Sequence, residues 1–190
     1  MNQIKCTSKL SDELMRRQLQ NVFRILAKPE HSRREQAIQV REEVSSTWET
    51  RAAQCKWFRW PTTIAAPGTR PLKGIAWREH GMLEFLEYHV GKTHPTPRDM
   101  RRCILDYAFE CHLPPLHDPN YFSEWGNPRT TQRLNKLANT LAALARNAKR
   151  HDEASYAVAI NDWEDDLYFL HNRYYVGFFH FAWPATDTLH

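Results

Sequence analysis

The chain has 190 residues, of which 42% are hydrophobic and 25% charged, and its formal net charge is +4. This composition is ordinary for a globular protein and excludes a wholly disordered chain. The length suffices for one buried core, and a count of only six glycines favours helices over a turn-rich β protein. The mildly basic balance, with a pI of about 8.9, lies below that of most proteins covered by nucleic acid.

The N-terminal residues and the cysteines indicate a compartment. The segment MNQIKCTSKLSDE is polar throughout and lacks the apolar core of a signal peptide. No stretch approaches the roughly 18 apolar residues that a membrane span requires. We therefore expect a cytoplasmic protein with no membrane partner and with reduced thiols. The four cysteines are Cys6, Cys55, Cys103 and Cys111.

A first helix is predicted over residues 12–28. Ser11 is a suitable N-cap, acidic residues follow in the first turn, and Pro29 ends the helix. Apolar side chains at intervals of three or four residues form one stripe, which consists of Met15, Leu19, Val22 and Leu26.

A second helix is predicted over residues 32–58. Ser32 and Glu35 have the spacing of a capping box, and Pro61 ends the element. Its apolar stripe is narrow and consists of Ala37, Val40, Val44, Trp48 and Cys55. We expect residues 1–61 to form an N-terminal helical arm that projects from the body or pairs with a partner.

A Pro/Gly linker over residues 62–75 separates this arm from a helical body over residues 76–190. The body starts with a predicted helix over residues 76–90, which Gly91 ends as a left-handed C-cap. Thr96 and Pro97 open the next helix, which closes at the segment Leu113-Pro114-Pro115. The inner face of that helix consists of Met100, Cys103, Ile104, Tyr107 and Cys111.

After a predicted loop, the sequence PPLHDPNYFSEWG, two further helices form an antiparallel hairpin. The fifth covers residues 128–150 after an N-cap at Asn127, and the sixth covers residues 153–175. The aromatic tail GFFHFAWP is expected to pack back onto the body. The fold class is therefore all-α, a bundle of five to six helices. The apolar stripes of the hairpin are Leu134, Leu137, Leu141 and Leu144 on one helix, and Ile160, Trp163, Leu167, Leu170 and Tyr174 on the other.

Several strings in the second half of the chain carry a resemblance. They are MLEFLEYHVGKTHPT, RRCILDYAF, SEWGNPRTTQRLNKLA, ARNAKR, AINDWEDDLYFL and FHFAWP. Together they resemble a group of uncharacterised bacterial helical proteins with no assigned activity. The resemblance implies a bacterial source and a helical fold, and it assigns no catalytic residue.

Charge is distributed unevenly over the hairpin. Residues 128–151 carry six positive side chains and no acid, whereas residues 152–175 carry six acids and one arginine. Most of the positive side chains lie opposite the leucine stripe, where they can hold phosphates of a nucleic acid. The alternative is a solvated or protein-binding face. The candidate nucleic-acid contacts are Arg129, Arg133, Lys136, Arg146 and Arg150.

Trp57 and Trp60 alternate with cations in the string KWFRW and lie off the apolar stripe of their predicted helix. They can stack on bases or anchor an interface, and the alternative is that they belong to the core.

Other chemistry has little support in the sequence. The spacing C-x₇-C-H-x₄-H, formed by Cys103, Cys111, His112 and His117, matches no zinc template. The acids of INDWEDD are expected to form a solvated helix face rather than a metal centre. Nucleophile-elbow, phosphate-loop and dinucleotide signatures are absent, so we expect no enzyme activity, cofactor or metal.

The sequence therefore predicts a nucleic-acid-associated accessory protein that holds the phosphate backbone through a basic helix. It does not distinguish DNA from RNA. The alternative is a protein-interaction subunit that builds a homo- or hetero-oligomer through its N-terminal arm and has no nucleic-acid role.

Overall fold

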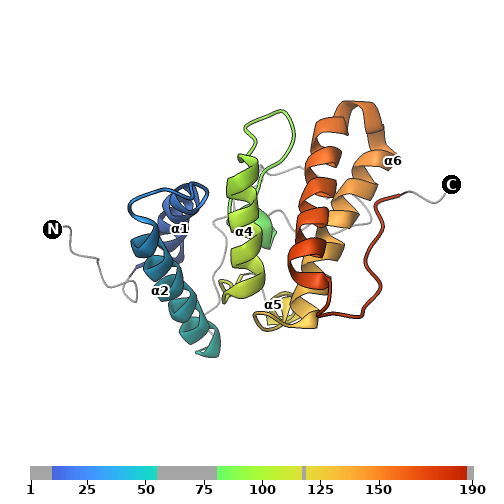
Figure 1. Cartoon of the computed structure of the whole chain (residues 1–190). Helices are drawn as coiled ribbons and strands as arrows, with labels where there is room; N and C mark the ends of the chain where they lie inside the picture. The colour runs from blue at the N-terminus through green and yellow to red at the C-terminus, as the bar shows by residue number, and fades with distance from the viewer. Residues whose placement is uncertain (1–9, 55–80, 117–118, 188–190) are drawn as a thin grey trace, which may run out of the picture.

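The computed structural model describes residues 10–54, 81–116 and 119–187. Within these ranges the regular structure is helical and no β-strand occurs, which confirms the all-α prediction. Figure 1 shows α1 and α2 together at one end, α4 in the middle and α6 at the other end. The elements are α1 (Asp12–Leu26), α2 (Arg34–Ala53), α3 (Met82–Phe85), α4 (Arg98–Glu110), α5 (Pro119–Trp125), α6 (Thr131–Leu170) and the π-helical turn η2 (His171–Tyr175).

Helix α1 forms where its capping and periodicity place it. The Ser11 hydroxyl accepts a hydrogen bond from the backbone N–H of Leu14, which satisfies a donor that the first turn leaves free. Met15, Leu19 and Val22 are buried, and this confirms most of the predicted stripe.

Helix α2 begins at Arg34, and the predicted capping box at Ser32 is wrong. The backbone N–H of Arg33 bonds to His31 Nδ1 at 3.1 Å, and that of Arg34 bonds to the His31 carbonyl at 3.0 Å. A turn built on His31 therefore sets the helix start, and Arg33 flanks it without a side-chain cap. The helix ends at Ala53, and residues 55–58 of the prediction lie outside the described ranges.

The narrow stripe of α2 packs into the body because one of its members is large. Val44 and Trp48 have no exposed surface, and the Trp48 ring makes edge contacts with Phe85 and Tyr107. The Trp48 indole N–H also donates to Asp12 Oδ1 at 2.9 Å. Helices α1, α2 and α4 thus contribute to one core, which takes up Val44 and Trp48 of this stripe. The linker predicted over residues 62–75 lies outside the described residues.

The helix predicted up to residue 90 is much shorter in the structure. Helix α3 is a single turn, because Glu87 takes a left-handed conformation with φ of 65°. Thr96 then fixes the following loop, donating its hydroxyl to the Glu87 carbonyl at 2.7 Å and accepting from the His89 N–H. Gly91 has the expected positive φ, yet it lies in this loop and caps no helix. Residues 76–80 lie outside the described ranges.

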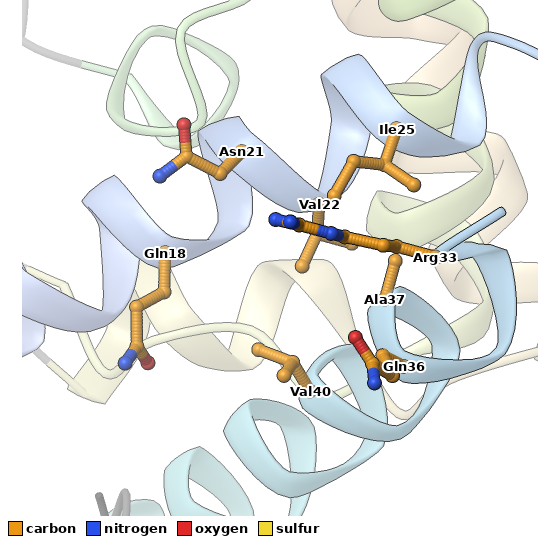
Figure 2. Close-up of a pocket in the computed structure, with 8 residues that line it drawn as sticks. All are labelled: Gln18, Asn21, Val22, Ile25, Arg33, Gln36, Ala37 and Val40. Atoms are coloured by element: carbon orange, nitrogen blue, oxygen red, sulfur yellow. The ribbon is translucent and has the colours of Figure 1, made fainter. Parts of the chain in front are cut away.

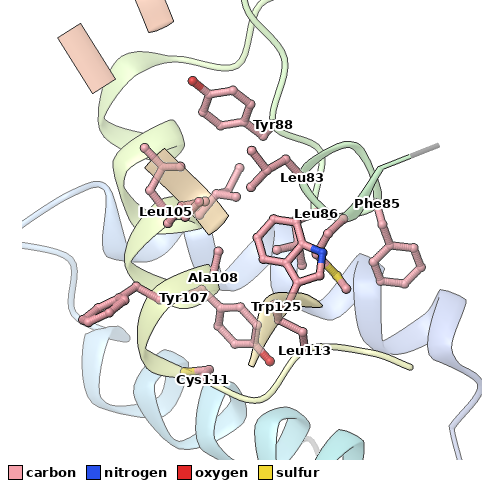
Figure 3. Close-up of a cluster of buried hydrophobic side chains, with 14 of the residues drawn as sticks. Leu83, Phe85, Leu86, Tyr88, Leu105, Tyr107, Ala108, Cys111, Leu113 and Trp125 are labelled. Carbon is pink, nitrogen blue, oxygen red and sulfur yellow. The ribbon is translucent and has the colours of Figure 1, made fainter. Parts of the chain in front are cut away.

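Helix α4 starts one residue after Pro97, the predicted first position, and ends three residues before Leu113, and the loop predicted after it contains helix α5. Tyr121 and Trp125 of α5 are buried, so the sequence YFSEW forms a helical turn that covers the core. Figure 3 shows Trp125 beside Tyr107 of α4 and Phe85 of α3 in one cluster. The predicted inner face of α4 is buried at Met100, Ile104 and Tyr107, with Cys111 buried just after the helix and Cys103 half-buried.

Helix α6 contains both helices of the predicted hairpin. Its backbone reverses at Asp152, which has the non-helical angles φ −165° and ψ 91°, and the two halves run side by side (Figure 1). Lys149 and Glu164 pair across the hairpin at 2.7 Å. The predicted N-cap at Asn127 is wrong, since the Thr130 hydroxyl accepts from the Arg133 N–H and caps the helix.

Most of the aromatic tail packs back on the body, as predicted, but Phe178 is 75% exposed. Phe179 makes an edge contact with Phe109 of α4. Trp183 contacts both His171 and Tyr175 of η2, and its ring also stacks on Phe181.

Candidate interaction surfaces

A basic face was predicted on the first half of α6, and the structure departs from this prediction most at Arg133. This side chain is only 1% exposed, so the prediction that it contacts phosphates is wrong. Its guanidinium donates to four backbone carbonyls of α4, α5 and the segments that follow them. These are Trp125 O (2.8 Å), Ala108 O (2.7 Å), Cys111 O (3.0 Å) and Gly126 O (2.6 Å).

The physical reason is that α5 and the end of α4 cover this side of α6. Arg133 comes four residues before Leu137, so it lies on the leucine side of α6 and not opposite it as predicted, and α5 and the end of α4 lie over it there. Burial lowers the pKa of Arg133 to about 10, so the group remains charged near neutral pH. The carbonyl dipoles take the place of water, and Arg133 is a structural bridge between three helices.

The remaining cations of this face are only partly available. Lys136 pairs with Glu124 of α5 at 2.6 Å, and Arg146 donates to the Ala185 carbonyl of the tail at 2.5 Å. Arg129 and Arg150 are exposed at opposite ends of this half of the hairpin. At ~1.5 Å per residue they lie on the order of 30 Å apart. The five predicted contacts therefore do not form one continuous basic stripe. Trp57 and Trp60 lie outside the described residues.

The acids of the second half of α6 were predicted to be solvated, and this is wrong for Asp166, which has no exposed surface. Arginines of α4 meet this run of carboxylates. Arg101 contacts Asp166 at 2.7 Å and Asp162 at 2.9 Å, and Arg98 pairs with Asp165. These ion pairs hold α4 against α6, while Asp166 Oδ1 is buried and has no hydrogen-bond partner among the described residues.

Cys103 and Cys111, the two described cysteines, are poorly suited to bind zinc. Burial raises the pKa of Cys103 and of Cys111 to about 11, so both are neutral thiols near pH 7. In the part of the chain that the structure describes, no three His, Cys, Asp or Glu side chains are grouped to hold a metal ion. His117 lies outside that part.

A second surface is the groove between α1 and α2 (Figure 2), which has a volume of about 240 Å³. Its floor is apolar, with Val22 buried on α1 and Ala37 buried on α2. The Arg33 side chain lies across one end (Figure 2). The lining residues are Gln18, Asn21, Val22 and Ile25 of α1, and Arg33, Gln36, Ala37 and Val40 of α2.

Three neutral amides surround this floor. Asn21 and Gln36 are exposed, and each amide both donates and accepts hydrogen bonds. Gln18 Oε1 is shielded from solvent and has no donor among the described residues. An unsatisfied acceptor costs about 1–3 kcal/mol. The sequence stripes of the two helices predicted their burial, but not this groove, which exists only once α1 and α2 pair.

No family model matches the sequence, and no curated protein or solved structure is significantly similar to it. Among the described helices, none combines the length and the apolar character needed to cross a bilayer.

Proposed function

We propose that this protein is a protein-interaction subunit that docks a partner on the face formed by α1 and α2. The observation that carries the proposal is the groove of Figure 2, where exposed amides surround an apolar floor. A water-filled groove of this composition gains free energy when apolar surface of a partner replaces the water.

The shape of the groove favours a helical partner. Two paired helices present a channel between their side-chain ridges, and a third helix fits into it by ridge-into-groove packing. Recognition of this kind uses apolar residues at helical spacing with polar residues at the edges. Val22, Ile25, Ala37 and Val40 supply the apolar part, and the amides supply the edges.

Nucleic-acid binding is the second candidate, and the structure favours it less. Lys136 and Lys149 each pair with a carboxylate of the protein, and Arg133 is buried. Each lost or neutralised cation removes one phosphate contact and its counterion release. Arg129, Arg146 and Arg150 remain as the candidates for such contacts.

A photo-crosslinking experiment tests the proposed function. The photoreactive amino acid p-benzoylphenylalanine replaces Gln36, which lies in the groove, or Ala154, an exposed residue at the tip of the α6 hairpin. After irradiation in cells, we expect discrete protein adducts from position 36 and none from position 154. Equal or absent adducts at the two positions would contradict the proposal.

A further inference from the structure

We infer that the groove between α1 and α2 binds the same face of a second copy of this chain, forming a two-fold symmetric dimer. This inference rests on the proposed function and names the partner. It follows from two properties of the face, its amide rim and the arrangement of its unpaired charges.

The exposed amides at the edge of the groove, Asn21 and Gln36, can pair with the same amides of a second copy. A two-fold interface brings one surface patch against an identical patch, so each group must tolerate groups of its own kind. Asn21 and Gln36 satisfy this requirement because an amide can donate to and accept from another amide.

Two charges on α2 have the spacing that a two-fold axis requires. Glu43 lies two turns after Gln36 and therefore on the same side of the helix, whereas Arg33 lies at the helix start. Ten residues separate the two, which is on the order of 15 Å. When two α2 helices meet antiparallel with the axis near residue 38, Arg33 of each copy approaches Glu43 of the other.

Neither of these charges has an ion-pair partner within the described part of the chain. Some other charges of the same two helices do pair, for example Arg51 with Asp12 and Arg41 with Glu110, whereas Arg24, Glu35 and Glu42 also form no ion pair within the described residues. Arg33 is exposed and Glu43 half-exposed, so both can reach a second molecule. Two equivalent pairs across the axis then fix the antiparallel orientation.

The size of the face sets the expected strength. Helix α2 has 20 residues and α1 has 15, so the face is about 30 Å long at its longer edge. Two helices offer an interface at the lower end of the specific range, roughly 1,200 Å² in total. We therefore expect a dimer that dissociates on dilution in the micromolar range.

Charge exchange tests the inference. Sedimentation velocity of the full chain between about 1 and about 100 μM should show a concentration-dependent dimer. R33E and E43R should each raise the dissociation constant at least about tenfold, and the double variant R33E/E43R should return it to within about threefold of wild type. R150E, an exposed charge reversal on α6, should leave it unchanged.

R33E should not unfold the protein, because a negative charge at the start of α2 interacts favourably with the helix dipole. E43R should not unfold it either, because Glu43 is half-exposed and forms no ion pair within the described residues. Circular dichroism verifies this point. A monomer at every concentration overturns the inference, and so does a dimer that withstands both single reversals or that the double variant fails to restore. Adducts of Gln36-substituted protein with a different protein, combined with a monomeric wild type, would retain the proposed function while overturning the dimer.

Discussion

Arg101 Nε lies 2.7 Å from Asp166 Oδ2, and this ion pair is buried between α4 and α6. The Tyr88 hydroxyl donates to the same oxygen at 2.6 Å, and the remaining Arg101 nitrogens bond to the Thr96 carbonyl and Asp162. Burial raises the pKa of Asp166, while the hydrogen bonds from Arg101 and Tyr88 act in the opposite direction. The pair is compensated in the interior because Arg101 has three acceptors and Asp166 Oδ2 has two donors, whereas Asp166 Oδ1 has no partner among the described residues.

Asp166→Asn should destabilise the protein strongly. The variant leaves the Arg101 charge buried with less compensation, which typically costs about 3–5 kcal/mol. Asp165→Asn is the matched control. The Asp165 carboxylate also pairs with arginines, but its side chain is about 30% exposed. We expect that variant to lose only ~0–1 kcal/mol. Urea unfolding measures both, and equal losses would show that burial of the pair has no special role.

Arg133→Met should likewise destabilise the fold rather than change a binding surface. It leaves four carbonyls without their donor, and we expect a loss of about 3–5 kcal/mol in the free energy of unfolding. Arg150→Met, on the exposed face of the same helix, should change stability by less than ~0.5 kcal/mol. If Arg133→Met kept the full stability of wild type, the structural role of Arg133 would be contradicted.

Any affinity for nucleic acid should be weak and easily screened. Three candidate cations, Arg129, Arg146 and Arg150, limit the slope of log affinity against log salt to about −3 on duplex DNA. Fluorescence anisotropy between about 50 and about 200 mM salt measures this slope. The triple alanine variant should remove what binding remains. A slope of about −5 or steeper would instead support the nucleic-acid function that the sequence predicted.

Asp106 should make the stability depend on pH in a defined direction. Burial raises its pKa, although Tyr174 and Arg173 donate to it at 2.6 and 2.9 Å. The folded state therefore holds this proton more tightly than the unfolded chain. The stability that protonated Asp106 contributes is fully present below the unfolded pKa of about 3.9. It is lost as the pH rises through the higher pKa of the folded state.

Asp106→Asn removes this titration while keeping an acceptor for Tyr174. Relative to the variant, wild type should lose stability between about pH 4 and pH 7, which urea unfolding at several pH values detects. If wild type instead became more stable relative to D106N as the pH rises, the raised pKa of Asp106 would be contradicted.

Local signals in the sequence predicted much of the helical structure. The stripe of Met15, Leu19 and Val22 and the cap at Ser11 identified α1, because both depend on residues within a few turns. The same signals failed at Ser32, where the competing turn at His31 forms, and at Glu87, whose left-handed backbone ends α3. Propensity alone does not decide between such local alternatives.

The candidate surfaces depended on tertiary structure that periodicity does not contain. The prediction placed Arg133 opposite the leucines, although its position four residues before Leu137 puts it on their side of the helix, and the periodicity carried no information on α5, which covers that side. The N-terminal arm was predicted as a region of association, yet its groove depends on how Val22 and Ala37 meet. The sequence gives the identity of the side chains on both surfaces, but it does not show which side chains of other helices lie next to them.

The short span of the bonds around Arg133 has a consequence for the order of folding. Its four carbonyl partners lie between 7 and 25 residues away in the chain, so these contacts close small loops at low entropic cost. The pairs Arg101–Asp166 and Arg41–Glu110 span 65 and 69 residues. We expect the corner of α4, α5 and α6 to form in the transition state, and the arm to dock afterwards. Arg133 substitutions should then slow refolding, while Arg41 substitutions should mainly accelerate unfolding.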